Sequence, residues 1–265
     1  MQDINWLGRT KLLVGDEGLS KLINSEVLIV GLGGVGSYAA EAICRSGVGR
    51  MTIVDGDVVD PTNRNRQLPA LFTTHGLSKA KLMGERLMQI NPELHLTVVE
   101  SFLTPEKAEE ILQNNYDYVI DAIDSITPKL TLLISAYKRN LKIISSMGAG
   151  GKLDPTKLEV ADISQTEFCR MAHYVRRRLR KEGIYTGIKT VFSTENVIKS
   201  SLMLTDGANY KRSAYGTISY LPCVFGCVCA SVVIRDLLGE PYPLYKSTYG
   251  NARRAKKNKI SPESL

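Results

Sequence analysis

Cysteine is scarce in this sequence and has no pattern of pairing. The 265 residues include five cysteines, Cys44, Cys169, Cys223, Cys227 and Cys229. An odd number in a long chain argues against a set of disulfides, so a reducing compartment fits better than an oxidising one. No basic and then apolar leader opens the chain, so secretion is not indicated and we expect a cytoplasmic protein.

The paired cysteines of a structural zinc site are missing as well. Four-thiolate sites use two Cys-x-x-Cys pairs, whereas Cys227 and Cys229 are separated by a single residue. Cys44 and Cys169 are isolated in the sequence. We therefore expect no structural zinc, and we interpret Cys223, Cys227 and Cys229 as small apolar residues of a buried helix.

A long uninterrupted apolar run is also absent. The most apolar stretch, residues 218–238, is interrupted by Pro222, Gly226, Arg235 and Asp236. A membrane span needs about 20 predominantly apolar residues. We therefore predict a strand end followed by a buried helix in this stretch, and no membrane span.

The composition that is present is typical of a soluble globular chain. Apolar residues make up 43% and charged residues 23%, which excludes disorder throughout. Lysine and arginine number 34 against 27 acidic residues, a net charge of +7. This excess suits a polyanionic partner such as a nucleotide or RNA, although a basic surface also serves solubility alone.

Alternating strand and helix patterns fill the first half of the chain. Residues 26–30 form an apolar run, residues 34–46 have the apolar spacing of a helix, and residues 51–54 are a second strand. The alternation continues with helices at 78–90, 105–113 and 128–139 and strands at 94–99, 116–122 and 142–146. Such βαβ units build parallel sheets, so we predict an α/β, Rossmann-like ATP-binding fold with a mostly parallel central sheet.

The second half has a different pattern, which we expect to extend the sheet with antiparallel strands. After Met147, residues 152–163 have the pattern of a hairpin with Asp154-Pro155 at its turn, and residues 167–181 that of a basic helix. Residues 195–215 are polar and indicate a mobile loop. We predict a single domain, residues 1–265, with a nucleotide-binding half (1–146), a half for substrate binding and dimer formation (147–240) and a basic tail (241–265).

A glycine-rich turn directly follows the first predicted strand and opens the first helix of the alternating pattern. Its residues are Gly31, Leu32, Gly33, Gly34, Val35 and Gly36. Glycines allow a tight turn and close approach of a phosphate to the backbone, and the helix start offers free N–H groups. This strand-turn-helix context indicates a nucleotide site rather than a packing turn.

Charged residues follow the strands at the same end of the predicted sheet. Asp55 has the position of a ribose-binding acid and fits an NAD enzyme as well as an ATP enzyme. Arg66 and Lys79 separate the two, because cations that grip phosphate oxygens suit a triphosphate. Asp121 and Asp124 lie just past a strand's carboxyl end, where an acid can hold a magnesium ion that bridges phosphates.

Together these motifs resemble the ubiquitin-activating-type adenylyltransferases, which include the bacterial enzymes that adenylate sulfur-carrier proteins. The matching residues are Gly31, Gly33, Gly34, Gly36, Asp55, Asp57, Asn63, Arg66, Gln67, Lys79, Asp121 and Asp124. The resemblance implies that all of these except Gln67 and Asp121 bind ATP. It also implies an ATP-dependent enzyme that forms an acyl-adenylate.

The same resemblance implies individual roles. Asp55 would bind the ribose, Arg66 and Lys79 the phosphates, and Asp124 the Mg²⁺ ion. Arg9 matches an arginine that reaches the ATP of the partner subunit, so a homodimer is expected. Arg9, Arg66, Lys79 and Asp124 are thus the expected catalytic residues.

Four further segments resemble one branch of this family, the tRNA threonylcarbamoyladenosine dehydratases. They are RTKLLVG at 9–15, SMGAGGKLDP at 146–155, VFSTE at 191–195 and GTISYLP at 216–222. This branch cyclises the modified adenosine next to the tRNA anticodon: ATP adenylates the side-chain carboxylate, and an internal nucleophile closes the ring. Ser125, where relatives often carry Asn, can still donate a hydrogen bond.

Two other functions share part of this pattern. A carrier-protein adenylyltransferase would use the same ATP residues to activate the C-terminal Gly-Gly of a sulfur-carrier or ubiquitin-like protein, and a sulfur-transfer protein is a further candidate partner. A nicotinamide-binding oxidoreductase, or a non-catalytic nucleotide-binding module, gives Arg66, Lys79 and Asp124 no clear role.

Three basic segments are candidates for contact with tRNA phosphates. They are the predicted helix around residues 170–181, Lys211-Arg212 beside the polar loop, and residues 253–259 of the tail. Phosphate contacts would make RNA binding depend on salt. A solvated helix face and a disordered tail are the alternatives.

Overall fold

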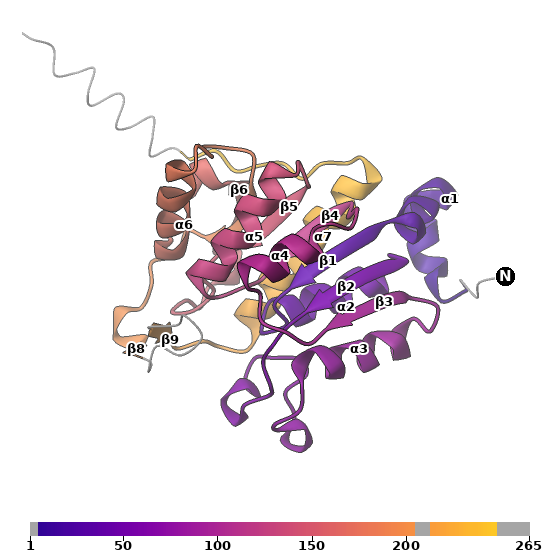
Figure 1. Ribbon diagram of the computed structural model, residues 1–265, viewed down its shortest axis with the longest axis horizontal. Coiled ribbons are helices and arrows are strands. Elements are labelled where there is room, and N and C mark those ends of the chain that lie inside the picture. Colours follow the sequence, from indigo (N-terminus) through magenta and orange to yellow (C-terminus); the bar gives the residue numbers. More distant parts are fainter. Residues whose placement is uncertain (1–4, 205–212, 248–265) are drawn as a thin grey trace, which may run out of the picture.

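A seven-stranded sheet forms the centre of the molecule (Figure 1). The computed structural model describes residues 5–204 and 213–247. The strands, in the order β3-β2-β1-β4-β5-β7-β6, are parallel except for β6, which is antiparallel to β7 at one edge. Their bounds are β1 Glu26–Val30, β2 Arg50–Val54, β3 His95–Val99, β4 Tyr118–Asp121, β5 Ile143–Ser146, β6 Leu158–Asp162 and β7 Lys189–Ser193. The mostly parallel α/β fold predicted from the sequence is therefore confirmed, as is its antiparallel extension.

Helices cover both faces of the sheet and bury two separate apolar clusters. The helices are α1 Gly8–Asn24, α2 Gly36–Arg45, α3 Lys79–Ile90, α4 Pro105–Ile111, α5 Ile126–Lys138, α6 Arg170–Lys181 and α7 Tyr220–Leu238. One cluster contains residues of α2, α3 and α7, and the other contains residues of α4, α5 and α6. This arrangement follows from right-handed βαβ crossovers, because segments that wind in opposite directions along the sheet place their helices on opposite faces.

The hairpin predicted over residues 152–163 is wrong. The Asp154 carboxylate accepts a hydrogen bond from the Thr156 N–H (2.9 Å), which caps a short 3₁₀ helix at Pro155–Lys157. β6 then pairs with β7, so that Leu158 lies opposite Ser193. Asp154-Pro155 does mark a turn, as predicted, but this turn does not join two paired strands. The partner of β6 is β7, which lies some thirty residues further along the chain, after α6.

The polar stretch at 195–215 contains more order than the predicted mobile loop. Leu202–Leu204 (β8) and Ser213–Tyr215 (β9) form a two-stranded antiparallel sheet. The connection between them lies outside the described residues, as do Lys211-Arg212 and the basic tail segment at 253–259.

α7 is the one helix of the described part that is long and apolar enough to cross a membrane by length and composition. Leu221, Phe225 and Cys229 of this helix are fully buried in the core. Gly226 allows it to approach α2 closely, since a Cβ there would lie 2.4 Å from the Val35 carbonyl oxygen. We therefore interpret α7 as a core helix. The strand end predicted before it is wrong, because no strand occupies residues 216–219.

Candidate nucleotide-binding site

The carboxyl ends of three central strands meet at one edge of the sheet. Val30, the last residue of β1, is in register with Val54 of β2 and with Asp121 of β4. The glycine turn, Asp55 and the segment that leads to Asp124 therefore begin side by side. Ligands of open α/β sheets bind at this edge, outside the carboxyl ends of the strands.

The glycines of the turn are required for different structural reasons. Gly31 has φ +90° and donates its N–H to the Val54 carbonyl oxygen at 2.8 Å. A Cβ on Gly36 would lie 1.7 Å from the Gly31 carbonyl oxygen, and one on Gly34 would lie 2.9 Å from Pro222. A Cβ on Gly33 would meet only the Gln67 amide group at 3.7 Å, an ordinary contact. Packing therefore requires three of the glycines, while Gly33 leaves space that a phosphate can approach.

The start of α2 is open to an anion. Its N-cap residue, Val35, has no side chain that can accept a hydrogen bond, and no side chain caps this helix. Only Ser37 and Ala39 return their N–H groups to the turn, bonding the carbonyl oxygens of Gly33 and Val35. The uncapped N–H groups and the positive end of the helix dipole suit a phosphate group.

Asp55 is fixed against the glycine turn. Its Oδ2 accepts the Leu32 N–H at 2.5 Å and its Oδ1 accepts the Asp57 N–H at 2.8 Å. Burial raises the pKa of Asp55, and the Leu32 hydrogen bond and the Lys79 charge oppose that shift. A carboxylate has lone pairs beyond the two that are used, so Asp55 can still accept ribose hydroxyl groups.

Lys79 and Asn63 already have partners within the chain. The Lys79 ammonium is 3.2 Å from Asp57 Oδ2, and its side chain is only 6% exposed. Asn63 Oδ1 accepts the Asp60 N–H at 3.1 Å and closes a capping box around the 3₁₀ helix at Pro61–Asn63. Asn63 therefore shapes the loop, whereas the Lys79 ammonium has three N–H donors and can bind a phosphate beside its bond to Asp57.

Arg66 and Asp124 place opposite charges near each other across the site. Arg66 donates through Nη1 to the Thr62 carbonyl oxygen (2.9 Å) and to Asn65 Oδ1 (2.8 Å). Burial lowers the pKa of Arg66, and the negative charge of Asp124 opposes that shift. The Asp124 residue is exposed at the rim. A cation that could bind phosphate oxygens and an acid that could bind a metal ion thus lie within electrostatic range of each other, on the loops that follow β2 and β4.

Asp121 does not lie on the rim, contrary to the sequence-based prediction. Its carboxylate is completely buried, where Oδ2 accepts Lys129 Nζ at 2.6 Å and the Ser145 hydroxyl at 2.5 Å. Its Oδ1 accepts the Ile123 N–H at 3.1 Å, at the start of the turn that leads to Asp124. A buried charge needs such partners. Asp121 therefore has a structural role, because its bond to the Ile123 N–H fixes the start of the loop that carries Asp124.

Lys129 is the residue of this cluster that sequence reasoning missed. It is fully buried, and it also donates to the Ser146 carbonyl oxygen at 2.9 Å. The available signal was a lysine among the apolar residues of the next helix, five positions after Asp124 and beside Leu130.

Arg9 is not brought to this site within one chain. It is exposed on α1, and Leu7, two residues earlier, packs against Gly47 in the turn that precedes β2. That turn is at the amino end of the strands, opposite the glycine turn (Figure 1). Any action of Arg9 on a nucleotide therefore requires a second copy of the chain.

The described residues contain no group of three or more His, Cys, Asp or Glu side chains that could hold a metal ion. Asp124 fits a magnesium ion that takes its other ligands from phosphates and water, as Mg²⁺ usually does in nucleotide sites. All five cysteines are free thiols. Cys229 is buried as predicted, but Cys227 is exposed and Cys223 is half-buried, so the prediction of three buried cysteines is wrong for these two. Burial raises the pKa of Cys44 and Cys229 to about 12 and that of Cys223 to about 11, so none of these three is poised as a thiolate.

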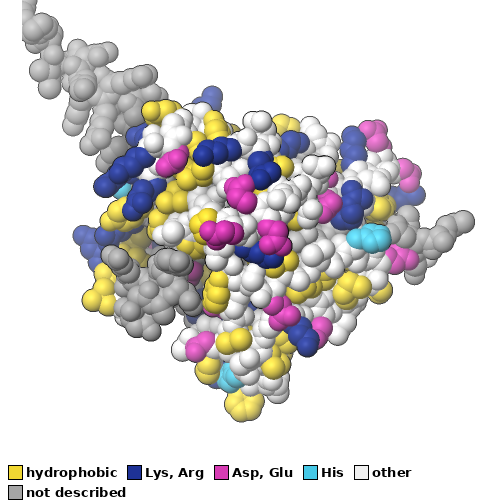
Figure 2. Space-filling view, in the orientation of Figure 1, with side chains coloured by type: hydrophobic (Ala, Val, Ile, Leu, Met, Phe, Trp, Pro, Cys, Tyr) yellow, Lys and Arg dark blue, Asp and Glu magenta, His cyan; other side chains and the backbone are white. Residues whose placement is uncertain are grey.

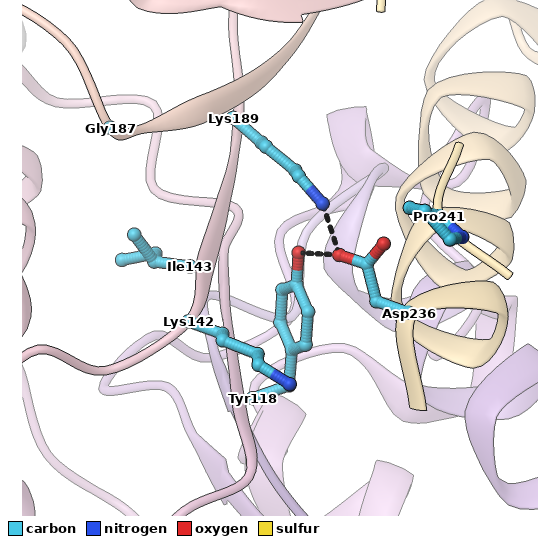
Figure 3. Close-up of a pocket in the computed structure, with 7 residues that line it drawn as sticks. All are labelled: Tyr118, Lys142, Ile143, Gly187, Lys189, Asp236 and Pro241. Atoms are coloured by element: carbon cyan, nitrogen blue, oxygen red, sulfur yellow. Dashed lines mark hydrogen bonds and ion pairs between the residues drawn. The ribbon is translucent and has the colours of Figure 1, made fainter. Parts of the chain in front are cut away.

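A cavity of about 360 Å³ lies far from this chemistry (Figure 3). Its lining includes Tyr118, Ile143 and Lys189, each the first residue of a strand, and Asp236 near the end of α7. Asp236 Oδ2 accepts the Tyr118 hydroxyl at 2.8 Å and also bonds Lys189 Nζ. The cavity is thus at the amino end of the sheet, and its charged groups join α7 to β4 and β7.

Comparison with known proteins finds one family over nearly the whole chain. The sequence profile of the ThiF family matches residues 8–262. The tRNA threonylcarbamoyladenosine dehydratase of Bacillus subtilis is 43% identical over 244 residues, which cover 89% of this chain and 96% of that protein. The Escherichia coli protein of the same name is 36% identical over 250 residues, covering 88% and 93%. The sulfur carrier protein ThiS adenylyltransferase of Escherichia coli is 35% identical, but over only 52% of this chain.

Solved structures give the same result. The crystal structure of the Escherichia coli tRNA N6-threonylcarbamoyladenosine dehydratase TcdA in complex with ATP has a TM-score of 0.80 to this chain, at 36% identity. The match covers 89% of this chain and 95% of that chain. A complex of the same protein with AMP superposes equally well, again with a TM-score of 0.80.

Proposed function

The chain belongs to the ThiF family, and we propose that it is an ATP-dependent tRNA threonylcarbamoyladenosine dehydratase. A match over nearly the full length of both chains to proteins of that name is the observation that carries the proposal. The match to a carrier-protein adenylyltransferase covers only 52% of this chain and 55% of that protein, so that function is the second candidate.

The reaction consists of two displacements. An oxygen of the side-chain carboxylate attacks the α-phosphorus of ATP, and pyrophosphate leaves. A nucleophilic atom of the same modified base then attacks the activated acyl carbon, and AMP leaves as the ring closes. The net change in the nucleoside is the loss of water, and adenylation provides the leaving group for the second step.

The residues at the carboxyl end of the sheet fit the first displacement. The N–H groups at the start of α2 face the phosphates, and Asp55 accepts the ribose hydroxyls. Arg66 and Lys79 offset the charge that develops as pyrophosphate leaves. Asp124 would hold a magnesium ion, and that ion would neutralise phosphate charge.

The active form in this proposal is a cytoplasmic homodimer in which Arg9 acts on the ATP of the partner subunit. Leu12 and Leu13, on the same helix as Arg9, are 88% and 86% exposed. Large apolar side chains that are left so exposed suit an interface with another chain. The five free thiols suit a reducing compartment.

Mass spectrometry of nucleosides tests the proposal directly. Transfer RNA that carries threonylcarbamoyladenosine is incubated with the protein, ATP and magnesium, then digested and analysed. We expect ATP-dependent loss of one water from that nucleoside, and no loss when ATP is omitted or when the protein carries Asp124→Ala. An unchanged nucleoside, with protein that is folded and binds ATP, would refute the proposal. ATP–pyrophosphate exchange stimulated by a carrier protein ending in Gly-Gly would then support the second candidate.

A further inference from the structure

The outer face of α6 is rich in basic residues. The exposed residues Arg170, His173, Tyr174, Arg177, Arg178 and Lys181 recur at the three- and four-residue spacing of one helix face, which we call the α6 face. Arg180 is exposed as well. Ala172, Val175 and Leu179 on the opposite side are fully buried. Four cations and no acid thus share one side of a twelve-residue helix.

Three of the four cations of the α6 face are not used to hold the fold together. In the described part of the chain, Arg177, Arg178 and Lys181 make no ion pair or side-chain hydrogen bond. Arg176, on the inner side, instead donates to the carbonyl oxygens of Ile163 and Thr166. Figure 2 shows the Lys and Arg side chains gathered over α6. Like charges so close together repel one another, so an anionic partner would relieve the repulsion.

A chain of contacts connects the α6 face to the nucleotide site. Arg170 donates to the Tyr215 hydroxyl of β9 at 3.1 Å. Two residues later, the Thr217 carbonyl oxygen accepts Asn65 Nδ2 at 2.9 Å, and Asn65 Oδ1 accepts Arg66 Nη1. The α6 face, β9 and the loop that carries Arg66 are therefore neighbours in the fold.

We infer that the α6 face binds the phosphate backbone of the substrate RNA beside the target adenosine, an inference that rests on the proposed function. A helix of twelve residues is about 18 Å long, enough to contact several successive phosphates. Tyr174, 47% exposed between the cations, offers a ring on which an unpaired loop base can stack. Several arginines beside an exposed aromatic ring favour RNA over an acidic protein, because the cations can contact successive phosphates while the ring stacks on a base.

The test compares two pairs of substitutions that remove the same charge. Arg177→Gln with Arg178→Gln lies on the α6 face, and Lys138→Gln with Lys142→Gln lies on exposed positions at the amino end of the sheet. Binding of threonylcarbamoyladenosine-containing tRNA is followed by fluorescence anisotropy over a salt series, together with kcat and KM for dehydration. Calorimetry with ATP checks that each variant is folded.

The α6 pair should weaken tRNA binding roughly tenfold at moderate salt and raise KM by a similar factor, with kcat at saturating tRNA unchanged. The slope of log K against log salt should fall in magnitude by about 1.4 to 1.8, since two phosphate contacts are lost. Arg177→Lys with Arg178→Lys should restore most of the binding, and the Lys138 and Lys142 pair should change it less than about twofold.

Equal tRNA affinity and equal salt slopes for both Gln pairs would overturn the inference while leaving the dehydratase activity intact. If the wild-type protein does not dehydrate the nucleoside at all, the proposed function fails. The binding series still decides whether the α6 face holds RNA, so the two failures are distinguishable.

Discussion

The two ends of the central sheet use similar charged residues for opposite purposes. At the amino end, Lys189 and the Tyr118 hydroxyl both bond Asp236, and these contacts close α7 onto the strands (Figure 3). At the carboxyl end, Arg66 and Asp124 lie on loops beside an uncapped helix, close enough for their charges to interact. The charges at the first end join elements of the fold, whereas those at the second are the ones that we propose to bind a ligand. Substitutions should accordingly affect stability at the first end and turnover at the second.

The largest effect on turnover is expected at Asp124. Asp124→Ala should lower kcat for tRNA dehydration by at least ~10³-fold, because phosphate charge is no longer neutralised by a held magnesium ion. The melting temperature should change by less than about 2 °C, since the residue is exposed. Turnover is measured over a magnesium titration beside a thermal melt. Near-normal turnover at saturating magnesium would remove Asp124 from the site.

The glycine turn is expected to contribute to both the stability of the fold and the binding of ATP. Two alanine substitutions distinguish these two contributions. Gly36→Ala places a Cβ against the Gly31 carbonyl oxygen, so unfolding free energy should fall by about 3 kcal/mol or more. Gly33→Ala meets only an ordinary contact and should cost less than about 1 kcal/mol. Its methyl group should nevertheless weaken ATP binding roughly tenfold in calorimetry. Equal stability of the two variants would show that the turn is less tight than described.

Arg9 tests whether a residue at the amino end of the sheet also has a role in catalysis. It lies at the amino end, yet the proposed dimer assigns it to the carboxyl end of the partner subunit. Arg9→Ala should lower kcat roughly 10²-fold without a change in melting temperature. When Arg9→Ala and Asp124→Ala chains are mixed, one site of each mixed dimer is intact, so about a quarter of the activity should return. Absence of recovery, with mixed dimers isolated through two different tags, would contradict the cross-subunit assignment.

The same contrast explains how much could be predicted from the sequence. The alternation of strands and helices up to Ser146, the glycine turn and the position of Asp55 follow from local patterns, and the structure has them within a few residues. The charges that we propose to act on a ligand also stand out in the sequence, because Arg66 and Asp124 lie on loops directly after strands or in their connections.

The errors lie where distant segments meet. β6 pairs with β7, and α6 lies between the two strands in the sequence. The local Asp154-Pro155 turn pattern predicts a hairpin but carries no information about a strand so far along the chain. The sequence predicts Asp121 at the rim because it follows a strand, and no local pattern shows that the Lys129 side chain is buried and pairs with the Asp121 carboxylate. A buried ion pair is a tertiary feature, and residue type alone does not separate it from a pair of surface charges.

The amino end should show its structural role through Asp236. Asp236→Ala leaves Lys189 and the Tyr118 hydroxyl without their shared acceptor, and Lys189 is 28% exposed while Asp236 is only 7% exposed. Loss of one member of a buried pair is costly, but the exposure of Lys189 reduces that cost, so we expect about 2 to 3 kcal/mol less unfolding free energy. The value of kcat should stay within about twofold of that of the wild type. Urea denaturation measures the loss of unfolding free energy, and the dehydration assay measures kcat.

Tyr118→Phe sharpens that result by removing only the hydroxyl. The tyrosine ring remains in the core, and Asp236 keeps its bond to Lys189, so the loss should be about 1 kcal/mol, the value of one hydrogen bond. The smaller loss for Tyr118→Phe than for Asp236→Ala would show that the carboxylate is the centre of the network. If either substitution lowered kcat as strongly as Asp124→Ala while leaving the melt unchanged, the amino end would have a part in catalysis, and the separation of the two ends would no longer hold.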